Sequence, residues 1–172
     1  NAGAYRVVLG PQDDYFSAAG IATLTGETYV VSAQADRMGY RLSGPKIAHA
    51  KGFNIVSDGI ATGSIQVPGS GEPIVLLADG GTTGGYPKIA TIISADLPRF
   101  VQQRPGSEVR FTAIGRDAAI AAARDQAAML AAVAAGLQPM GGGLDAERLL
   151  SLNLVDGWVD AHEPRDPAGR AA

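Results

Sequence analysis

The feature that most constrains the fold of this chain is a series of short β-branched segments, separated by glycine and proline at intervals of about ten residues. Turn signals at this density leave little room for helices between residues 4 and 114. The segments are rich in Val, Ile, Thr and Tyr, which favour strands. We therefore expect residues 4–115 to form an antiparallel β-barrel with one or two short helices, one of them over residues 13–20.

The composition changes to alanine at Arg116, where a second region begins. Apolar residues recur at helical spacing from Ile120 to Leu137, which predicts a helix with one narrow apolar stripe. A glycine-rich hinge follows, and Asp145 is placed to cap a second helical segment. The end of the chain is rich in proline and charge, which is typical of disorder. We expect residues 116–172 to be a helical extension with a disordered end.

Composition argues against several classes of partner. The chain of 172 residues has a net charge of −3 and no cluster of basic residues, so we expect no nucleic-acid binding. It contains no cysteine and its two histidines are far apart, so we expect no metal site. No uninterrupted apolar run approaches the roughly 20 residues of a membrane span, so we expect no membrane and a cytoplasmic location.

The stretch "ADGGTTGGYPKIATI" contains the densest group of glycines. A phosphate-binding loop leads into a helix, whereas here β-branched residues follow, so the loop lacks a helix dipole for an anion. A glycine-rich loop of this length instead suits the lining of a cleft. Strand alternation puts Lys88 on one face with Ala90, from where we expect it to reach over a pocket rim as a catalytic residue. The loop residues expected to bind substrate are Thr83, Gly84, Gly85 and Tyr86. The alternative interpretation is a wide connecting loop followed by a solvated lysine.

Two arginines are candidates for anion binding. Alternation along "ADRMGYRL" puts Arg37 and Arg41 on one strand face, with a glycine between them. Guanidinium groups bind planar oxyanions through two hydrogen bonds, so this face could hold a carboxylate, bicarbonate or phosphate. The alternative is a pair of surface arginines in weak ion pairs with Asp36 and Asp58.

Two further residues carry suitable chemistry. Gln66 alternates with Ile65 and Val67, so it faces away from the apolar side, where its amide could bind an amide or lactam substrate. An exposed strand residue is the alternative. Asp79 ends an apolar strand beside the glycine-rich loop and is a candidate acid or base.

Four segments in order carry a resemblance to a known family: "RVVLGPQDDYF", "SAQADRMGYRLSGP", "SDGIATGSIQVPGSGEPIVLLADGGTTGGYPKIATIISAD" and "RPGSEVRF". Over residues 5–112 the chain resembles the second half of the allophanate hydrolase subunit 2 family. This family is also known as the 5-oxoprolinase C subunit, KipA or the carboxyltransferase A/B subdomain. The resemblance implies a cyclophilin-like β-barrel.

The resemblance also implies an activity and partners. The "GGYPKIAT" form favours the branch that hydrolyses 5-oxoproline, a cyclic amide, to glutamate with ATP bound by the complex at an unlocated place. The implied partners are an allophanate hydrolase subunit 1 or KipI-like protein (the 5-oxoprolinase B subunit) and the 5-oxoprolinase A subunit. One alternative is the carboxyltransferase component of a urea carboxylase or urea amidolyase, which uses carboxybiotin. Another is a non-catalytic KipA-type module that binds a KipI-like partner.

Under the enzymatic interpretations, Lys88, Arg41 and Arg37 stabilise developing oxyanions. Gln66 and the amides of the glycine-rich loop orient the substrate, and Asp79 is the acid or base. The family's first half is absent from this chain, so we expect the isolated fragment to fold without turning over substrate.

Overall fold

The computed structural model describes residues 3–137, 147 and 151. Contacts divide the chain into two compact units, Asn1–Ala132 and Val133–Ala172. The strands are β1 (Tyr5–Leu9), β2 (Tyr29–Ala35), β3 (Gly39–Ser43), β4 (Asp58–Gly59), β5 (Ser64–Gln66), β6 (Ile74–Leu76), β7 (Thr83–Gly84), β8 (Lys88–Ile92), β9 (Glu108–Val109) and β10 (Phe111–Ala113). The helices are η1 (Asp13–Tyr15), α1 (Ala18–Gly26), α2 (Leu97–Phe100) and α3 (Arg116–Gly136).

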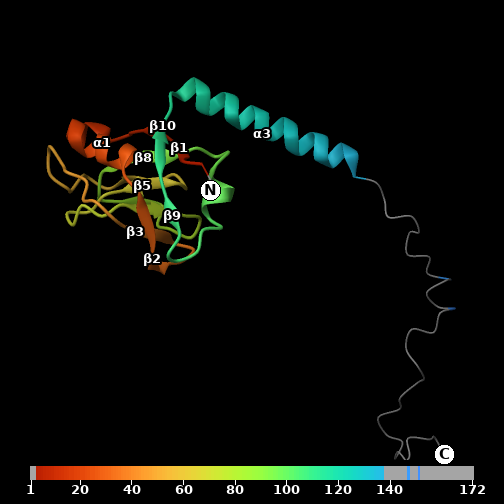
Figure 1. Cartoon of the computed structure of the whole chain (residues 1–172), viewed down its shortest axis with the longest axis horizontal. Helices are drawn as coiled ribbons and strands as arrows, with labels where there is room; N and C mark the ends of the chain where they lie inside the picture. Colours follow the sequence, from red (N-terminus) through yellow and green to blue (C-terminus); the bar gives the residue numbers. More distant parts are fainter. Residues whose placement is uncertain (1–2, 138–146, 148–150, 152–172) are drawn as a thin grey trace, which may run out of the picture. The chain divides into compact units, whose positions relative to one another are not determined.

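Eight strands form one sheet that curls into a nearly closed barrel, in the order β10-β1-β8-β5-β6-β3-β2-β9. Only Arg110 separates β9 from β10, and Figure 1 shows both on one continuous segment. Its first part pairs with β2 at Val109, and its second part pairs with β1 at Phe111. One segment therefore joins the two edges of the sheet and leaves few free backbone groups. This confirms the mainly β barrel that the sequence predicts.

One pairing departs from the antiparallel expectation, because β10 runs parallel to β1. The direction of β10 is set by β9, which continues into it without a turn and is antiparallel to β2. A segment that joins both edges cannot reverse between them. Closure therefore imposes the parallel pair.

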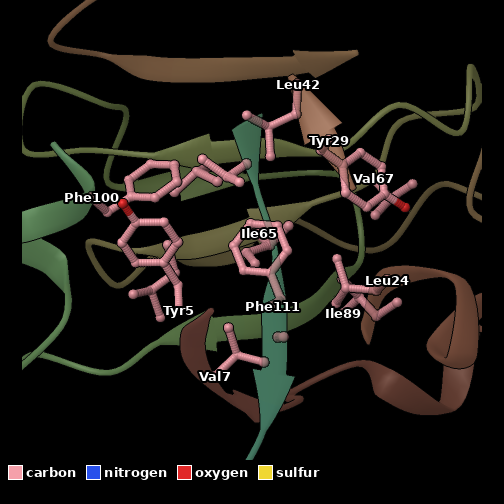
Figure 2. Close-up of a cluster of buried hydrophobic side chains, with 14 of the residues drawn as sticks. Tyr5, Val7, Leu24, Tyr29, Leu42, Ile65, Val67, Ile89, Phe100 and Phe111 are labelled. Atoms are coloured by element: carbon pink, nitrogen blue, oxygen red, sulfur yellow. The ribbon is translucent and has the colours of Figure 1, made fainter. Parts of the chain in front are cut away.

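The interior of the barrel is filled by alternate residues of its strands together with aromatic rings (Figure 2). The Tyr5 ring meets the Phe100 ring edge-on, with 5.2 Å between centroids. Phe111 lies within 6.5 Å of Tyr5, Phe100 and Tyr29, again between ring centroids. Phe111 thus links aromatic residues of β1, β2 and α2 at the segment that closes the barrel.

The expected helix over residues 13–20 is wrong in position. Asp13–Tyr15 form a 3-10 turn, and α1 begins at Ala18. Ser17 caps α1, because its Oγ accepts a hydrogen bond from the Gly20 amide at 3.0 Å. The cap at Ser17 fixes the start of the helix, and the acidic residues before it remain outside.

The alanine-rich helix is confirmed as α3, and none of its residues is buried. By length and composition alone, α3 could cross a membrane, whereas the sequence predicts no such segment. Length and composition are weak evidence of a membrane span. Gln126 of α3 donates a hydrogen bond to the Ala95 carbonyl at 3.3 Å. The expected second helical segment and disordered end lie outside the described residues, apart from Glu147 and Ser151. The domain boundary at residue 115 stays a prediction.

Replacing Phe111 tests whether closure depends on aromatic packing. Phe111→Ala should lower the free energy of unfolding by about 3–5 kcal/mol, measured by urea denaturation, because it removes a side chain that is only 1% exposed. Phe111→Leu should lower the free energy of unfolding by a smaller amount. It keeps the test available if the alanine variant does not fold. Val56→Ala is the control, since Val56 is 92% exposed and should cost under about 0.5 kcal/mol. Equal losses for Phe111→Ala and Val56→Ala would contradict this role.

Candidate functional site

A β-bulge on β8 decides where Lys88 points. Gln66 of β5 lies opposite Lys88, and Ile65 lies opposite Ala90, so Ile89 is the extra residue. Ile65 faces the barrel interior (Figure 2), and Ala90 opposite it therefore does so too. Lys88 shares the outer face with Gln66. The expectation that Lys88 and Ala90 share a face is wrong, because one inserted residue reverses the alternation.

The outer face at Lys88 is covered by a small two-stranded sheet. In it Asp58 pairs with Gly84 and Gly59 pairs with Thr83. Two further hydrogen bonds extend this pairing, from Ile60 N to the Thr82 carbonyl at 3.0 Å and from Ile55 N to the Gly85 carbonyl at 2.8 Å. We call residues 55–60 and 82–86 the flap. The glycine-rich loop expected to line a cleft therefore supplies half of a cover over the barrel wall.

Gln66 lies between the barrel and the flap. It faces outward as expected, but it is 5% exposed rather than solvated. Its Nε2 donates a hydrogen bond to the Tyr86 carbonyl at 3.2 Å. A Cβ on Gly84 would lie 2.5 Å from the same Nε2, so a larger residue there would require the Gln66 amide to shift. Tyr86 itself is 41% exposed.

Lys88 is buried beside Gln66 with its charge paired. Its side chain is 1% exposed, and its Nζ donates to Asp58 Oδ2 at 2.8 Å and to the Gly59 carbonyl at 3.0 Å. Gln12 Nε2 donates to the same Asp58 Oδ2 at 2.9 Å. We call Gln12, Asp58, Gln66 and Lys88 the Lys88 site. In this structure Lys88 lies under the flap rather than over an open rim.

Sequence reasoning missed Gln12 as a site residue and considered Asp58 only as a partner for an arginine. A usable signal existed for Asp58. A lysine on a strand that becomes covered needs a carboxylate, and Asp58 lies among glycines near such a strand. No local signal pointed to Gln12, which is 76 residues from Lys88 in the chain.

Hydrogen bonds to Asp58 hold its pKa well below the ordinary value. Those from the Lys88 ammonium, the Gln12 amide and the Gly59 amide, in that order, lower the pKa to about 2, and the charge of Lys88 adds to this. Asp58 is therefore ionised at neutral pH. Its side chain is nevertheless 51% exposed, in contrast to that of Lys88.

The two candidate arginines do not form one strand face. β3 begins at Gly39, so Arg37 lies in the turn before the strand, and the alternation through Arg37 and Arg41 is wrong. Arg37 is 87% exposed and its Nε lies 2.9 Å from Asp79 Oδ2. Arg37 and Asp79 thus form a surface ion pair with each other.

Arg41 lines a different space, a cleft of about 380 Å³ that also includes Gly80 and Gly81. Paired residues place Arg41, Ile74, Gln66 and Lys88 in one row across four strands. Three strand spacings separate Arg41 from Lys88, which is roughly 14 Å between their backbones. The predicted site residues are therefore split between the Arg41 cleft and the Lys88 site.

Comparison with known proteins assigns this barrel to a class. The family model for the carboxyltransferase domain, subdomain A and B, matches residues 1–113, so the chain belongs to this family. It is similar to the 5-oxoprolinase C subunit of Haemophilus influenzae, with 46% identity over 50% of this chain and 28% of that protein. It is also similar to the 5-oxoprolinase C subunit of Escherichia coli, with 37% identity over 70% of this chain and 39% of that protein.

A solved structure extends the likeness to a second group of enzymes. The Kluyveromyces lactis urea amidolyase matches with a TM-score of 0.68 and 26% identity, over 73% of this chain and 8% of that one. The chain spans well under half the length of the two curated relatives above. It is therefore homologous to part of an enzyme.

The paired charge of Asp58 should make stability depend on pH. A carboxyl whose pKa is lowered from 3.8 to about 2 by folding contributes stability above the first value, and that contribution is lost as pH falls toward the second. Melting temperatures of wild type and Asp58→Asn should therefore differ at pH 6 and converge toward pH 2. Asp14→Asn is the control, since it removes an ion pair whose two side chains are both more than half exposed, and should change little at pH 6. A difference in melting temperature between wild type and Asp58→Asn that stays constant from pH 6 to pH 2 would contradict the pairing of Asp58 with Lys88.

Adjacent glycines of the flap provide a matched test of its contact with Gln66. Gly84→Ala should loosen the flap, because its Cβ would overlap the Gln66 amide, whereas a Cβ on Gly85 meets its nearest atom at an ordinary 3.7 Å. Hydrogen exchange at the Ile60 amide, which bonds across the flap, should quicken about tenfold or more in Gly84→Ala. Gly85→Ala should exchange like wild type. Equal exchange of the Ile60 amide in both variants would show that the contact between Gly84 and Gln66 does not hold the flap in place.

Proposed function

We propose that this chain is the C-terminal domain of a protein like the 5-oxoprolinase C subunit, part of a heteromeric enzyme that hydrolyses 5-oxoproline to glutamate with ATP. One observation carries the proposal beyond the family. A buried cation, Lys88, lies opposite a buried primary amide, Gln66, under a glycine-rich flap. These groups match the two ends of 5-oxoproline, which carries a carboxylate and a lactam amide.

The Gln66 side chain has hydrogen-bonding capacity left for a lactam. Its Nε2 is used by the Tyr86 carbonyl, and within the described residues no donor reaches its Oε1. That oxygen is suited to accept the lactam N–H and thereby orient the ring. Hydrolysis then breaks the lactam C–N bond, with water supplying the new carboxylate oxygen and conversion of ATP to ADP and phosphate driving the reaction. Arg41 and the Arg37–Asp79 pair lie away from the Lys88 site, so we give them no contact with this ring.

ATP does not fit the Lys88 site. A triphosphate needs several cations or a bound metal. The site has a single ammonium, and no group of three or more His, Asp or Glu that could hold a metal occurs among the described residues. We therefore propose that ATP binds elsewhere in the complex. The partners in this proposal are the KipI-like B subunit of 5-oxoprolinase and its A subunit, and we place the assembly in the cytoplasm.

A carboxyltransferase function is the second candidate, and the likeness to urea amidolyase favours it. In that reaction a carboxyl group moves from carboxybiotin to urea. Lys88 would then hold the transferred carboxylate, and Gln66 would bind the urea amide. The two candidates differ in substrate and co-reactant, while the residues in contact with substrate are the same.

Turnover by the full-length parent protein, purified with its partner proteins, tests both candidates. We expect 5-oxoproline to stimulate ATP hydrolysis, and Lys88→Ala to reduce that stimulation by about 100-fold or more, because it removes the buried cation. Lys51→Ala is the control, since Lys51 is an exposed lysine paired with Asp14. Stimulation by 5-oxoproline that survives in Lys88→Ala would remove Lys88 from the mechanism.

Other outcomes separate the remaining interpretations. If 5-oxoproline has no effect and urea accepts a carboxyl group from carboxybiotin, the carboxyltransferase function holds. If neither reaction occurs and Lys88→Ala abolishes assembly with the partner, the KipA-type binding module is favoured.

A further inference from the structure

The Lys88 ammonium and the Gln12 amide form a donor pair that is fixed to the barrel. Gln12 N donates to the Lys88 carbonyl at 3.1 Å, and Gln12 Oε1 accepts from the Lys88 backbone amide at 3.2 Å. These two hydrogen bonds lock the residues to each other. Their side-chain donors, Lys88 Nζ and Gln12 Nε2, then converge on a single oxygen, Asp58 Oδ2. Convergent donors of this kind are what a carboxylate-binding site requires.

The acceptor belongs to a much weaker element than the donors. Asp58 lies on β4, which is two residues long and pairs only with the two-residue β7. Its carboxylate is 51% exposed, whereas the Lys88 side chain is 1% exposed. The buried ammonium is therefore separated from solvent by a carboxylate on a thin flap. Displacement of the flap would uncover the donor pair without disturbing the barrel.

The Lys88 ammonium also has an unused donor. An ammonium has three N–H groups. Two acceptors, Asp58 Oδ2 and the Gly59 carbonyl, meet it within the part of the chain that the structure describes. A second carboxylate oxygen would use the third N–H group.

We propose that Lys88 and Gln12 form a binding site for the carboxylate of a small molecule, which Asp58 occupies in the free chain and which the ligand takes over by exchange. The ligand carboxylate takes the place of the Asp58 carboxylate. Lys88 therefore remains paired, and the buried charge is never left uncompensated. Release of Asp58 frees the flap to move with it. If the proposed function holds, the ligand is 5-oxoproline, with its lactam at Gln66.

Chemical rescue tests the site without reference to any enzymatic activity. In the full chain, Asp58→Ala removes the carboxylate that the two donors share, leaves Lys88 only the Gly59 carbonyl, and should lower the melting temperature. Formate or acetate at about 100 mM should restore a large part of the loss, and sodium chloride at equal ionic strength should not. Rescue should vanish in Asp58→Ala combined with Lys88→Ala. Asp14→Ala is the matched control, since its partner Lys51 is exposed and should show no preference for carboxylates.

A second variant keeps the test available if Asp58→Ala does not fold. Asp58→Asn retains the shape of the side chain but not its charge, so acetate no longer competes with an internal carboxylate. Acetate should bind Asp58→Asn about tenfold more tightly than wild type, equivalent to about 1.4 kcal/mol, as followed by the NMR signals of the Gln12 side-chain amide. Equal binding to both, or equal rescue of Asp58→Ala by formate and chloride, would overturn the proposal. Acetate binding without 5-oxoproline binding would leave the carboxylate site standing and remove the proposed substrate.

Discussion

An ammonium group cannot be buried in a protein wall without a partner, and this requirement organises one side of the barrel. The charge of Lys88 is 1% exposed, and an unpaired charge at that depth would be strongly destabilising. Asp58 supplies the compensating charge, which brings β4 onto the outer face. β4 in turn positions β7 and the glycine-rich loop. This pair is also the largest cause of the low pKa of Asp58, and hydrogen bonds from Gln12 and the Gly59 amide add to it.

The barrel makes that arrangement possible because it supplies a rigid wall. The segment from Glu108 to Ala113 pairs with both edges of the sheet, and Phe111 packs among aromatic rings where the edges meet (Figure 2). Two hydrogen bonds between Gln12 and the Lys88 backbone attach both residues to this wall. The donors of Lys88 and Gln12 are therefore fixed relative to each other, while the carboxylate that they hold lies on a thin cover. In the proposed exchange, rigid donors and a movable acceptor would form a binding site that is assembled before a ligand arrives.

The split between the Arg41 cleft and the Lys88 site changes which residues can act together. Arg41 lines a cleft with Gly80 and Gly81, the first glycines of the loop, whereas Gly84 lies against Gln66. Arg37 and Asp79 pair with each other at the surface. The cleft that Arg41 lines includes none of the four residues of the Lys88 site. Under the proposed function, Lys88 and Gln66 therefore bind the lactam, and Gln12 and Asp58 support them.

The sequence by itself determined the mainly β barrel, the alanine-rich helix and the outward face of Gln66, because these depend on local spacing of apolar residues and turns. It also singled out the glycine-rich loop and Lys88. Only the tertiary structure decided which face Lys88 occupies, since a one-residue bulge at Ile89 reverses strand alternation without a local signal. It also decided the partners of Lys88, because Gln12 and Asp58 are brought to it across 76 and 30 residues of chain. The spacing of apolar residues predicts local secondary structure. The partner of a buried charge depends on which residues the fold brings beside it.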